Sequence, residues 1–268
     1  MATQAPGGGF IWYELMTSDA ASAAAFYNAV VGWTIQPHGT TMPNGSEYRM
    51  IGRSDGGHAG GVLTLTEGMA AYGTKPGWIG YIHASDLNAA VARLEAAGGA
   101  VHMPVTDMGV GRMAMVSDPW GATFYLMDPT PPADQPDAVS DVFADKPQHM
   151  RWNQHWSPDA KAASAFYGDL VGWRQDGGMT WPDGRSYLFV HAGDVQIGAV
   201  GDMLPEGRGC RWEFILGVDD IDRAVAAVQD SGGTVDGNVN PVPGGDWAAS
   251  IIDPQGARLG IVGPRKES

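Results

Sequence analysis

The sequence predicts an α+β protein built from four βαβββ modules, and two internal repeats indicate this. Residues 10–33 match residues 150–173, displaced by 140 positions (10 to 150). Residues 77–101 match residues 211–235, displaced by 134 positions (77 to 211). Repeated segments of this kind indicate related supersecondary units that stack against one another. Each half of the chain therefore contains two modules.

Each module is expected to open with a strand and continue with a helix. The strand segments FIWYELMT, WIGYIHAS, RWNQHWS and RWEFILGV are rich in aromatic and β-branched residues. Leu87, Ala90, Val91 and Leu94 have the spacing of one apolar helix stripe. Aspartates stand where N-caps are expected and glycines where the helices should end. These residues are Asp19, Asp86, Asp159, Asp220, Gly32, Gly98, Gly172 and Gly232.

Turn signals complete each module with short strands. PNGSEY at 43–48 and PDGRSY at 182–187 predict hairpins that place Tyr48 and Tyr187 at matched positions. The D-P-x-G pattern at Asp118 and Asp253 predicts a turn before the last strand.

A proline- and aspartate-rich stretch divides the chain into two predicted domains. Residues 128–148 contain five prolines and five aspartates, which is the composition of a linker. The predicted boundaries are a first domain at 1–128 with modules at about 10–67 and 77–128, a linker at 129–148, and a second domain at 149–268 with modules at about 150–203 and 210–264.

Composition excludes several classes of partner. The formal net charge of −14 disfavours nucleic acid and anionic membranes, which require a basic surface. No stretch has the length of a membrane span, and MATQAPGGGF lacks the pattern of a secretory signal. The single cysteine, Cys210, fits a reducing compartment and is interpreted as a structural thiol. We therefore expect a cytoplasmic protein with a small-molecule ligand, either a monomer or a homodimer.

The repeated pattern D-x6-F-Y-x4-G-W, together with D-P-x-G before the last strand, resembles the vicinal oxygen chelate superfamily. That superfamily includes glyoxalase I, bleomycin-resistance proteins and extradiol dioxygenases, and the resemblance is to its two-domain bacterial members. It implies two glyoxalase/bleomycin-resistance-like domains, in each of which paired modules form a curled, cup-forming mixed sheet around a ligand. The resemblance is specific for the fold and not for the reaction.

The resemblance also implies where a metal would bind. The family's first-strand ligand lies seven residues before the helix-starting aspartate, at Trp12 and Trp152 here, and its last-strand glutamate position is occupied by Tyr125 and Gly260. Neither an indole nor a glycine ligates a divalent ion, so no metal cofactor is predicted at these positions. The alternative is a divalent metal held at non-standard positions by side chains drawn from Glu14, His58, His149, Gln154, His155, His191 and Glu213.

Aromatic side chains are the main candidates for ligand contact. Planar or apolar ligands stack on such rings, although the indoles alternatively fill the interior. Strand alternation places Trp12, Glu14 and Met16 on one face, and His155 on the face opposite Gln154. Glu14 is the candidate catalytic residue or cation partner if it faces inward. The predicted ligand-binding residues are Trp12, Glu14, His58, Trp78, Arg112, Tyr125, Trp152, Gln154 and Trp212, with the first half, which holds Glu14, His58 and Arg112, as the polar site.

The sequence leaves two alternative functions open, one as a binding protein and one as an enzyme. The first is a metal-independent small-molecule-binding protein that sequesters an aromatic or cationic compound, as the resemblance to bleomycin-resistance proteins implies. The alternative is a glyoxalase-like lyase, isomerase or dioxygenase, in which a metal at non-standard positions polarises a substrate with adjacent oxygens. The aromatic residues and the strand alternation favour the first.

Overall fold

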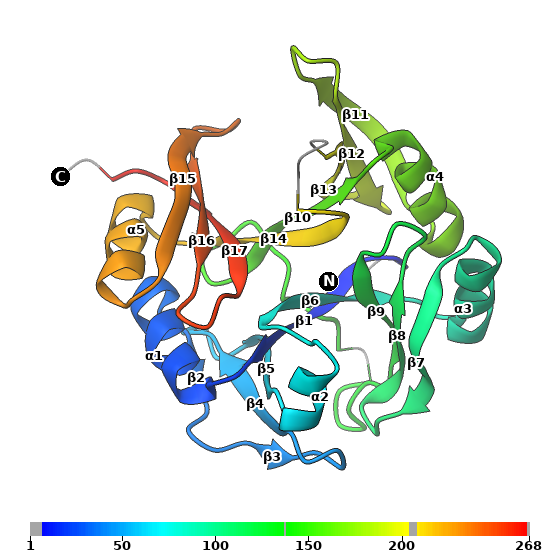
Figure 1. The fold of residues 1–268 in the computed structure, drawn as a ribbon, viewed down its shortest axis with the longest axis horizontal. Coiled ribbons are helices and arrows are strands. Elements are labelled where there is room, and N and C mark those ends of the chain that lie inside the picture. Colours follow the sequence, from blue (N-terminus) through cyan, green and yellow to red (C-terminus); the bar gives the residue numbers. More distant parts are fainter. Residues whose placement is uncertain (1–6, 137, 204–207, 267–268) are drawn as a thin grey trace. The chain divides into compact units, whose positions relative to one another are not determined.

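The computed structural model describes residues 7–136, 138–203 and 208–266, and its elements follow the predicted order of four βαβββ modules (Figure 1). Residues 1–6, in the segment where no secretory signal is expected, lie outside the described residues. The first module contains β1 (Phe10–Thr17), α1 (Ala20–Val31), β2 (Thr34–Ile35), β3 (Thr40–Thr41), β4 (Glu47–Gly52) and β5 (His58–Thr64), and the short helix α2 (Glu67–Ala71) follows it. The second contains β6 (Gly77–His83), α3 (Leu87–Ala96), β7 (Ala100–Asp107), β8 (Gly111–Ser117) and β9 (Thr123–Pro129). The third contains β10 (Met150–Ser157), α4 (Ala160–Val171), β11 (Arg174–Thr180), β12 (Ser186–Ala192) and β13 (Val195–Asp202). The fourth contains β14 (Arg211–Gly217), α5 (Ile221–Asp230), β15 (Thr234–Pro241), β16 (Trp247–Ile252) and β17 (Arg258–Gly263).

Each module contains four strands in a mixed arrangement of the same topology, and the first module adds the short strand β3, which pairs with β4. The strand orders are β2–β4–β5–β1, β7–β8–β9–β6, β11–β12–β13–β10 and β15–β16–β17–β14. The first strand of every module pairs in parallel with the last one, while the other neighbours are antiparallel. Parallel pairing requires a long crossover, which the helix and the intervening strands supply. The predicted α+β class with mixed sheets is confirmed.

The caps that the sequence predicts begin and end the helices. The side chains of Asp19, Asp86, Asp159 and Asp220 accept hydrogen bonds from backbone amides in the first turns of α1, α3, α4 and α5. Gly32 and Gly172 end α1 and α4 in the left-handed conformation, at φ of 81° and 78°. A residue without a β-carbon adopts this conformation without strain. None of the described helices is long and apolar enough to cross a membrane.

The chain divides into two compact units, and each unit combines one module from each half of the sequence. Unit 1 comprises Met1–Ile11, Gly80–Ser140 and Trp152–Glu213, so it holds most of the second and third modules. Unit 2 comprises Trp12–Ile79, Asp141–Arg151 and Phe214–Ser268, and it holds most of the first and fourth modules. In unit 1, α3 packs against α4, and in unit 2, α1 packs against α5 (Figure 1).

In unit 2 a buried hydrogen bond joins the two modules. The hydroxyl of Tyr27, from the F-Y pair of α1, donates to Asp253 Oδ2 at 3.1 Å. Asp253 belongs to the D-P-x-G turn of the fourth module, and its Oδ1 accepts from the amides of Gln255 and Ala257. Burial, with the Asp253 charge as the second cause, raises the pKa of Tyr27 well above its ordinary value. The phenol therefore remains neutral and acts as a donor.

Unit 1 repeats this interaction with the second and third modules. Tyr167 of α4 donates to Asp118 Oδ2 at 3.0 Å, and Asp118 Oδ1 accepts from the amides of Trp120 and Ala122. Asp118 is 2% exposed. Two motifs that lie far apart in the sequence thus meet in both units.

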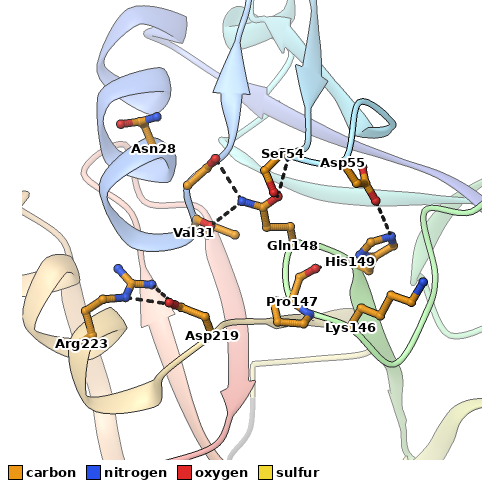
Figure 2. Close-up of a pocket in the computed structure, with 11 residues that line it drawn as sticks. Asn28, Val31, Ser54, Asp55, Lys146, Pro147, Gln148, His149, Asp219 and Arg223 are labelled. Atoms are coloured by element: carbon orange, nitrogen blue, oxygen red, sulfur yellow. Dashed lines mark hydrogen bonds and ion pairs between the residues drawn. The ribbon is translucent and has the colours of Figure 1, made fainter. Parts of the chain in front are cut away.

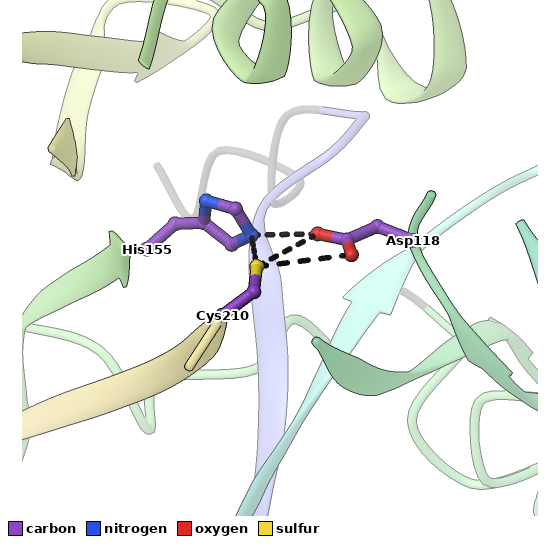
Figure 3. Close-up of side chains that lie close together, drawn as sticks. All are labelled: Asp118, His155 and Cys210. Atoms are coloured by element: carbon purple, nitrogen blue, oxygen red, sulfur yellow. Dashed lines mark hydrogen bonds and ion pairs between the residues drawn. The ribbon is translucent and has the colours of Figure 1, made fainter. Parts of the chain in front are cut away.

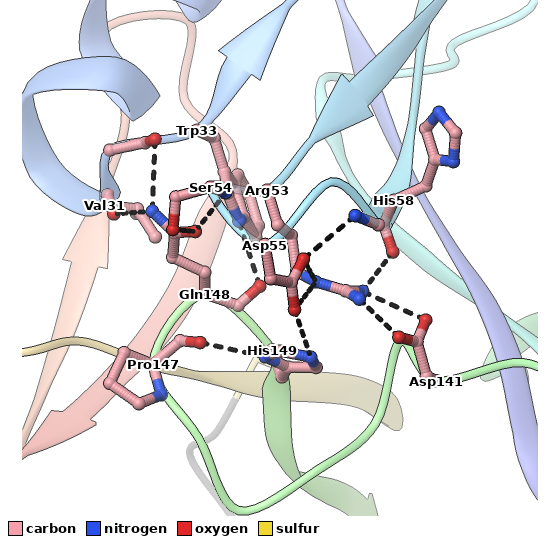
Figure 4. Close-up of polar contacts among 12 residues, drawn as sticks. Val31, Trp33, Arg53, Ser54, Asp55, His58, Asp141, Pro147, Gln148 and His149 are labelled. Carbon is pink, nitrogen blue, oxygen red and sulfur yellow. Dashed lines mark hydrogen bonds and ion pairs between the residues drawn. The ribbon is translucent and has the colours of Figure 1, made fainter.

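In unit 2, hydrogen bonds of the Gln148 side chain attach the segment from Asp141 to Arg151 to the first module (Figure 4). Its side-chain Nε2 donates to the carbonyls of Val31 and Gly32, both at 3.1 Å. Its Oε1 accepts from Ser54 N at 2.8 Å and Ser54 Oγ at 2.9 Å. Gln148 is also the one non-glycine residue with positive φ, 66°, in the described part of the chain. Its side-chain bonds offset the strain of that conformation.

A buried arginine makes the second attachment of this segment. The side chain of Arg53 is 1% exposed, and its guanidinium binds Asp55, Asp141 and the carbonyl of His58 (Figure 4). Burial is the largest single influence on the pKa of Arg53 and lowers it. The Asp141 and Asp55 carboxylates together outweigh burial, so the pKa is raised above its ordinary value.

We expect Gln148→Ala to lower the free energy of unfolding by about 2–3 kcal/mol, because four hydrogen bonds are lost. Gln148→Gly should recover about 1 kcal/mol of this, because glycine adopts positive φ without strain. Urea denaturation measures both values. Gln229→Ala, at an exposed position of α5, is the control and should change the value by less than about 0.5 kcal/mol. Equal effects of the alanine and glycine variants would contradict the role given to the strained backbone.

Candidate functional site

Alternation along β1 and β10 separates two chemically distinct faces, as predicted. On β1, Trp12 and Met16 are partly exposed, whereas Tyr13 and Leu15 are fully buried. Glu14 is 3% exposed. On β10, Trp152, Gln154 and Trp156 are partly exposed, and His155 is fully buried.

The paired tyrosines of the two hairpins organise the exposed faces. Trp12 Nε1 donates to the Tyr48 hydroxyl at 2.7 Å, and Trp152 Nε1 donates to the Tyr187 hydroxyl at the same distance. Gln154 Nε2 adds a second donor to Tyr187 at 2.8 Å. An indole donor therefore holds each phenol oxygen over the exposed face of its sheet.

In unit 1 five rings form a continuous surface, which we name the aromatic face. Its members are Trp152, Trp156, Trp181, Tyr187 and Phe189. Trp156 and Trp181 are stacked, with ring centres 5.9 Å apart and planes at 18°. Tyr187 contacts Trp181 at 5.4 Å and Phe189 at 6.0 Å, and Trp152 meets Phe189 edge-on at 6.0 Å. All but Tyr187 are partly exposed.

Sequence reasoning did not single out Trp181 or Phe189. Their counterparts in the first repeat are Met42 and Met50, and the counterpart of Trp156 is Met16. A comparison of the two halves along the predicted face was the signal that could have found them.

Charged groups surround the aromatic face. The Arg185 guanidinium lies 4.5 Å from the Trp181 ring centre, and that of Arg211 lies 5.9 Å from the Trp156 ring centre. Glu213 Oε2 accepts from Trp156 Nε1 at 2.8 Å, and its Oε1 accepts from Arg211 Nε at 2.8 Å. The acid is therefore already paired, and the arginines are the groups that lie over the rings.

The structure places Trp78 and Trp212 in aromatic cores on the helix side. Trp78 Nε1 donates to the Tyr27 hydroxyl at 3.0 Å, and its ring packs on Trp33 in unit 2. Trp212 is 9% exposed and lies between Tyr167 and Trp173 in unit 1. Trp212 is buried and Trp78 is partly exposed, and a ligand-binding role for them stays a prediction.

The remaining predicted ligand residues do not form one cluster within a unit. His58 and Glu14 belong to unit 2, and the His58 ring is exposed. Arg112 and Tyr125 belong to unit 1. Arg112 pairs with Asp128 at 3.1 Å, and Tyr125 is stacked on Tyr81 at 4.3 Å. Their binding roles also stay predictions.

The residues at the family's metal positions do not fit a metal. Trp12 and Trp152 donate their indole N–H groups to tyrosines, and the Tyr125 ring is stacked. Gly260 has no side chain, and a β-carbon there would approach Ile215 Cγ1 to 2.8 Å. No set of three oxygen, nitrogen or sulfur ligands exists at these positions, so no step is assigned to a metal there.

A different group of side chains that could hold a metal, Asp118, His155 and Cys210, lies in unit 1 (Figure 3). His155 Nε2 lies 2.6 Å from Asp118 Oδ2 and 3.5 Å from Cys210 Sγ. Cys210 Sγ is 3.9 Å from both Asp118 oxygens. Burial, then the Asp118 charge, raises the pKa of Cys210 to about 12. Sequence reasoning noted His155 within its strand but interpreted Cys210 as structural.

A second group, Asp55, Asp141 and His149 in unit 2, has a different character. The Arg53 guanidinium already binds both carboxylates. His149 Nδ1 lies 2.8 Å from the carbonyl of Pro147, and its Nε2 lies 3.8 Å from Asp55 (Figure 4). A guanidinium thus occupies the position that a cation would take.

A cavity of about 540 Å³ adjoins the segment from Asp141 to Arg151 in unit 2 (Figure 2). Several of the polar side chains that line the cavity already make hydrogen bonds or ion pairs within the protein. Gln148 is bound to α1 and Ser54, and Arg223 binds Asp219 and the carbonyls of Ala29 and Val30. We interpret the cavity as the groove beside a structural attachment.

Comparison with known families decides the classification. Residues 9–126 match the family model described as "Glyoxalase/Bleomycin resistance protein/Dioxygenase superfamily". Residues 154–262 match a model described as "Glyoxalase-like domain". The chain belongs to the glyoxalase/bleomycin resistance protein/dioxygenase superfamily. The resemblance drawn from the F-Y, G-W and D-P-x-G motifs is confirmed.

Two curated relatives match this chain over nearly its full length. "Putative glyoxylase CFP32" of Mycobacterium tuberculosis is 28% identical over 254 residues, covering 94% of each chain. "Anthracycline biosynthesis protein DnrV" of Streptomyces peucetius is 28% identical over 269 residues, covering 94% of this chain and 91% of the relative.

Solved structures of superfamily members share the fold at low identity. The Mn(II)-bound glyoxalase from Novosphingobium aromaticivorans has a TM-score of 0.62 at 16% identity, covering 98% of this chain and 84% of that one. The 2,3-dioxygenase LapB from Pseudomonas sp. KL28 has a TM-score of 0.63 at 14% identity, covering 98% and 95%. At this identity the likeness concerns the fold and not the reaction.

The aromatic face makes a prediction about alkaline pH. Burial raises the pKa of Tyr187 from 10.0 to about 12, against the lowering effect of its Trp152 and Gln154 donors. Because the folded-state pKa is raised, its contribution to stability is fully present below about pH 10 and is lost between about pH 10 and 12. The loss amounts to at most roughly 3 kcal/mol.

Tyr187→Phe should therefore reduce the dependence of the unfolding free energy on pH in this range. The measurement is urea denaturation at several alkaline pH values. Tyr72→Phe, at a side chain that is 94% exposed, is the control and should leave the dependence unchanged. Identical pH dependence in the Tyr187 variant and the wild type would contradict the assignment.

Proposed function

We propose that the protein binds a planar aromatic compound with oxygen substituents on the aromatic face of unit 1. The observation that supports this best is the group of partly exposed rings around Tyr187. Exposed aromatic surface is costly in water, and flat rings offer offset stacking to a planar ligand. Gln154 and Glu213 supply polar groups at its edge for orientation.

The first module lacks the aromatic rings of the third module, and this difference supports the proposal. It has the same strand, hairpin tyrosine and indole hydrogen bond, but Met16, Met42 and Met50 stand where the third module has aromatic rings. The fold therefore does not require aromatic residues at these positions. Sequence reasoning favoured the first half as the polar site, whereas the geometry favours the third module.

Between an aromatic and a cationic ligand, the local charges favour the aromatic one. The positions above Trp181 and Trp156, where a cationic ligand would interact with the rings, are approached by Arg185 and Arg211. Each of these guanidinium groups is paired with a carboxylate, Asp183 or Glu213, but it covers a ring face that a cation would use, and its remaining N–H groups can donate to phenolate, enolate or carboxylate oxygens.

The name of one relative agrees with this class of ligand. DnrV is named as an anthracycline biosynthesis protein, and anthracyclines contain fused aromatic rings with oxygen substituents. The alternative, a lyase, isomerase or dioxygenase reaction, requires a metal that holds the substrate oxygens. The residues at the family's metal positions do not supply that metal, so this alternative depends on ligands at non-standard positions, such as the group of Asp118, His155 and Cys210 in unit 1.

The experiment is a calorimetric titration with 1,4-dihydroxyanthraquinone, a planar fused-ring probe. Trp181→Ala should weaken its binding by about tenfold or more, because stacking and buried area are lost. Met42→Ala, at the matched position of the first module, is the control and should leave binding unchanged. Arg185→Gln should weaken binding of this oxygenated probe more than binding of anthracene, which has no oxygens.

Two outcomes would contradict the proposal. One is the absence of probe binding to the wild type. The other is an equal loss of affinity in the Trp181 and Met42 variants. Binding of a non-aromatic quaternary ammonium probe in place of the quinone would favour the cationic ligand.

A further inference from the structure

Three side chains of different chemical types converge on one point in the interior of unit 1. Asp118 comes from the turn between β8 and β9, His155 from β10, and Cys210 immediately precedes β14 (Figure 3). The side chains of Asp118 and His155 are both 0% exposed, and Cys210 is partly exposed. A buried carboxylate, imidazole and thiol in mutual contact need a physical explanation.

Unit 2 shows that the fold does not need this group. Its tyrosine–aspartate hydrogen bond, between Tyr27 and Asp253, has the same geometry as the one between Tyr167 and Asp118. At the positions that correspond to His155 and Cys210, the first half of the chain has Leu15 and Pro76. The histidine and the cysteine are therefore additions to a structural pair that is complete without them.

The arrangement differs from a relay that activates a nucleophile. In such a relay one imidazole nitrogen faces the nucleophile and the other faces the acid. Here the same nitrogen, His155 Nε2, faces both Asp118 Oδ2 and Cys210 Sγ. His155 Nδ1 is buried and has no hydrogen-bond partner among the described residues. Three ligand atoms that converge on one point are the arrangement of a metal site.

We propose that Asp118, His155 and Cys210 bind a divalent transition-metal ion of the zinc class. Zinc accepts this mixture of thiolate, imidazole and carboxylate ligands. Ligand atoms at a tetrahedral zinc ion lie about 3.3–3.6 Å apart, given bond lengths of about 2.0–2.3 Å. The sulfur–nitrogen separation of 3.5 Å fits, and the sulfur–oxygen separation of 3.9 Å is slightly wide. The imidazole and carboxylate, at 2.6 Å, must separate by about 0.7 Å.

The neighbours of Asp118 prepare it as a ligand. The amides of Trp120 and Ala122 hold Oδ1, and Tyr167 donates to Oδ2. Hydrogen bonds of this kind orient a ligating carboxylate. The partly exposed Cys210 provides the side from which an ion and a solvent ligand reach the site. This position differs from the family's metal positions at Trp12, Trp152, Tyr125 and Gly260, and the proposal does not depend on the proposed ligand of the aromatic face.

The test is a titration of untagged, reduced, chelator-treated and desalted protein with Co(II), followed by competition with Zn(II). About one equivalent of Co(II) should bind, with visible d–d bands and a near-ultraviolet thiolate-to-cobalt charge-transfer band. Cys210→Ser should abolish the charge-transfer band. His155→Leu, which installs the residue of the first module, should weaken Zn(II) binding by more than about tenfold.

The control is His58→Leu, which removes an exposed histidine and should not change Co(II) binding. Zn(II) should also raise the melting temperature of the wild type and not that of Cys210→Ser. Binding of less than about a tenth of an equivalent would overturn the proposal, as would a spectrum that Cys210→Ser leaves unchanged. If His155→Leu fails to fold, the cysteine variant alone decides between these outcomes.

Discussion

The hydrogen bond from a buried tyrosine to a buried aspartate is the interaction on which both units depend. It brings the F-Y pair of one module to the D-P-x-G turn of another, as Tyr27–Asp253 and Tyr167–Asp118. A buried carboxylate is costly unless its oxygens are hydrogen-bonded, and here one oxygen closes its own turn while the other accepts the phenol. Changing either partner would remove a buried hydrogen bond between two modules. The two sequence motifs therefore recur together because they are halves of one contact.

Both units contain this tyrosine–aspartate pair, but the two halves of the chain differ on both faces of their opening strands, β1 and β10. On the helix side, Leu15 of the first half corresponds to His155 of the second. On the opposite side, Met16 corresponds to Trp156. Apolar packing can satisfy the fold at each of these positions, as the first module demonstrates. Positions where the second half departs from apolar packing are therefore where a ligand or an ion best explains the residue.

The sequence predicted the elements of the fold more completely than the site. Repeats, aspartate caps and glycine ends depend on local patterns, and they located four modules and their helices. The hydrogen bond from Trp78 to Tyr27 was not predictable, because 51 residues separate the two side chains. Cys210 could not be related to Asp118, since 92 residues separate them and no local motif links them. Such contacts depend on which modules pack together, and the repeat pattern alone leaves that open.

Strand β10 connects the two proposals, because its side chains alternate between the two faces. On one face His155 contacts Cys210, which immediately precedes β14. On the other face Trp156 donates to Glu213, within β14. The two strands are thus joined on both sides, through Cys210 just before β14 and through Glu213 within it. An ion held by His155 and Cys210 would fix the spacing of β10 and β14, and this spacing positions Trp156 within the aromatic face. Ion binding and ligand binding would then be thermodynamically coupled through one pair of strands.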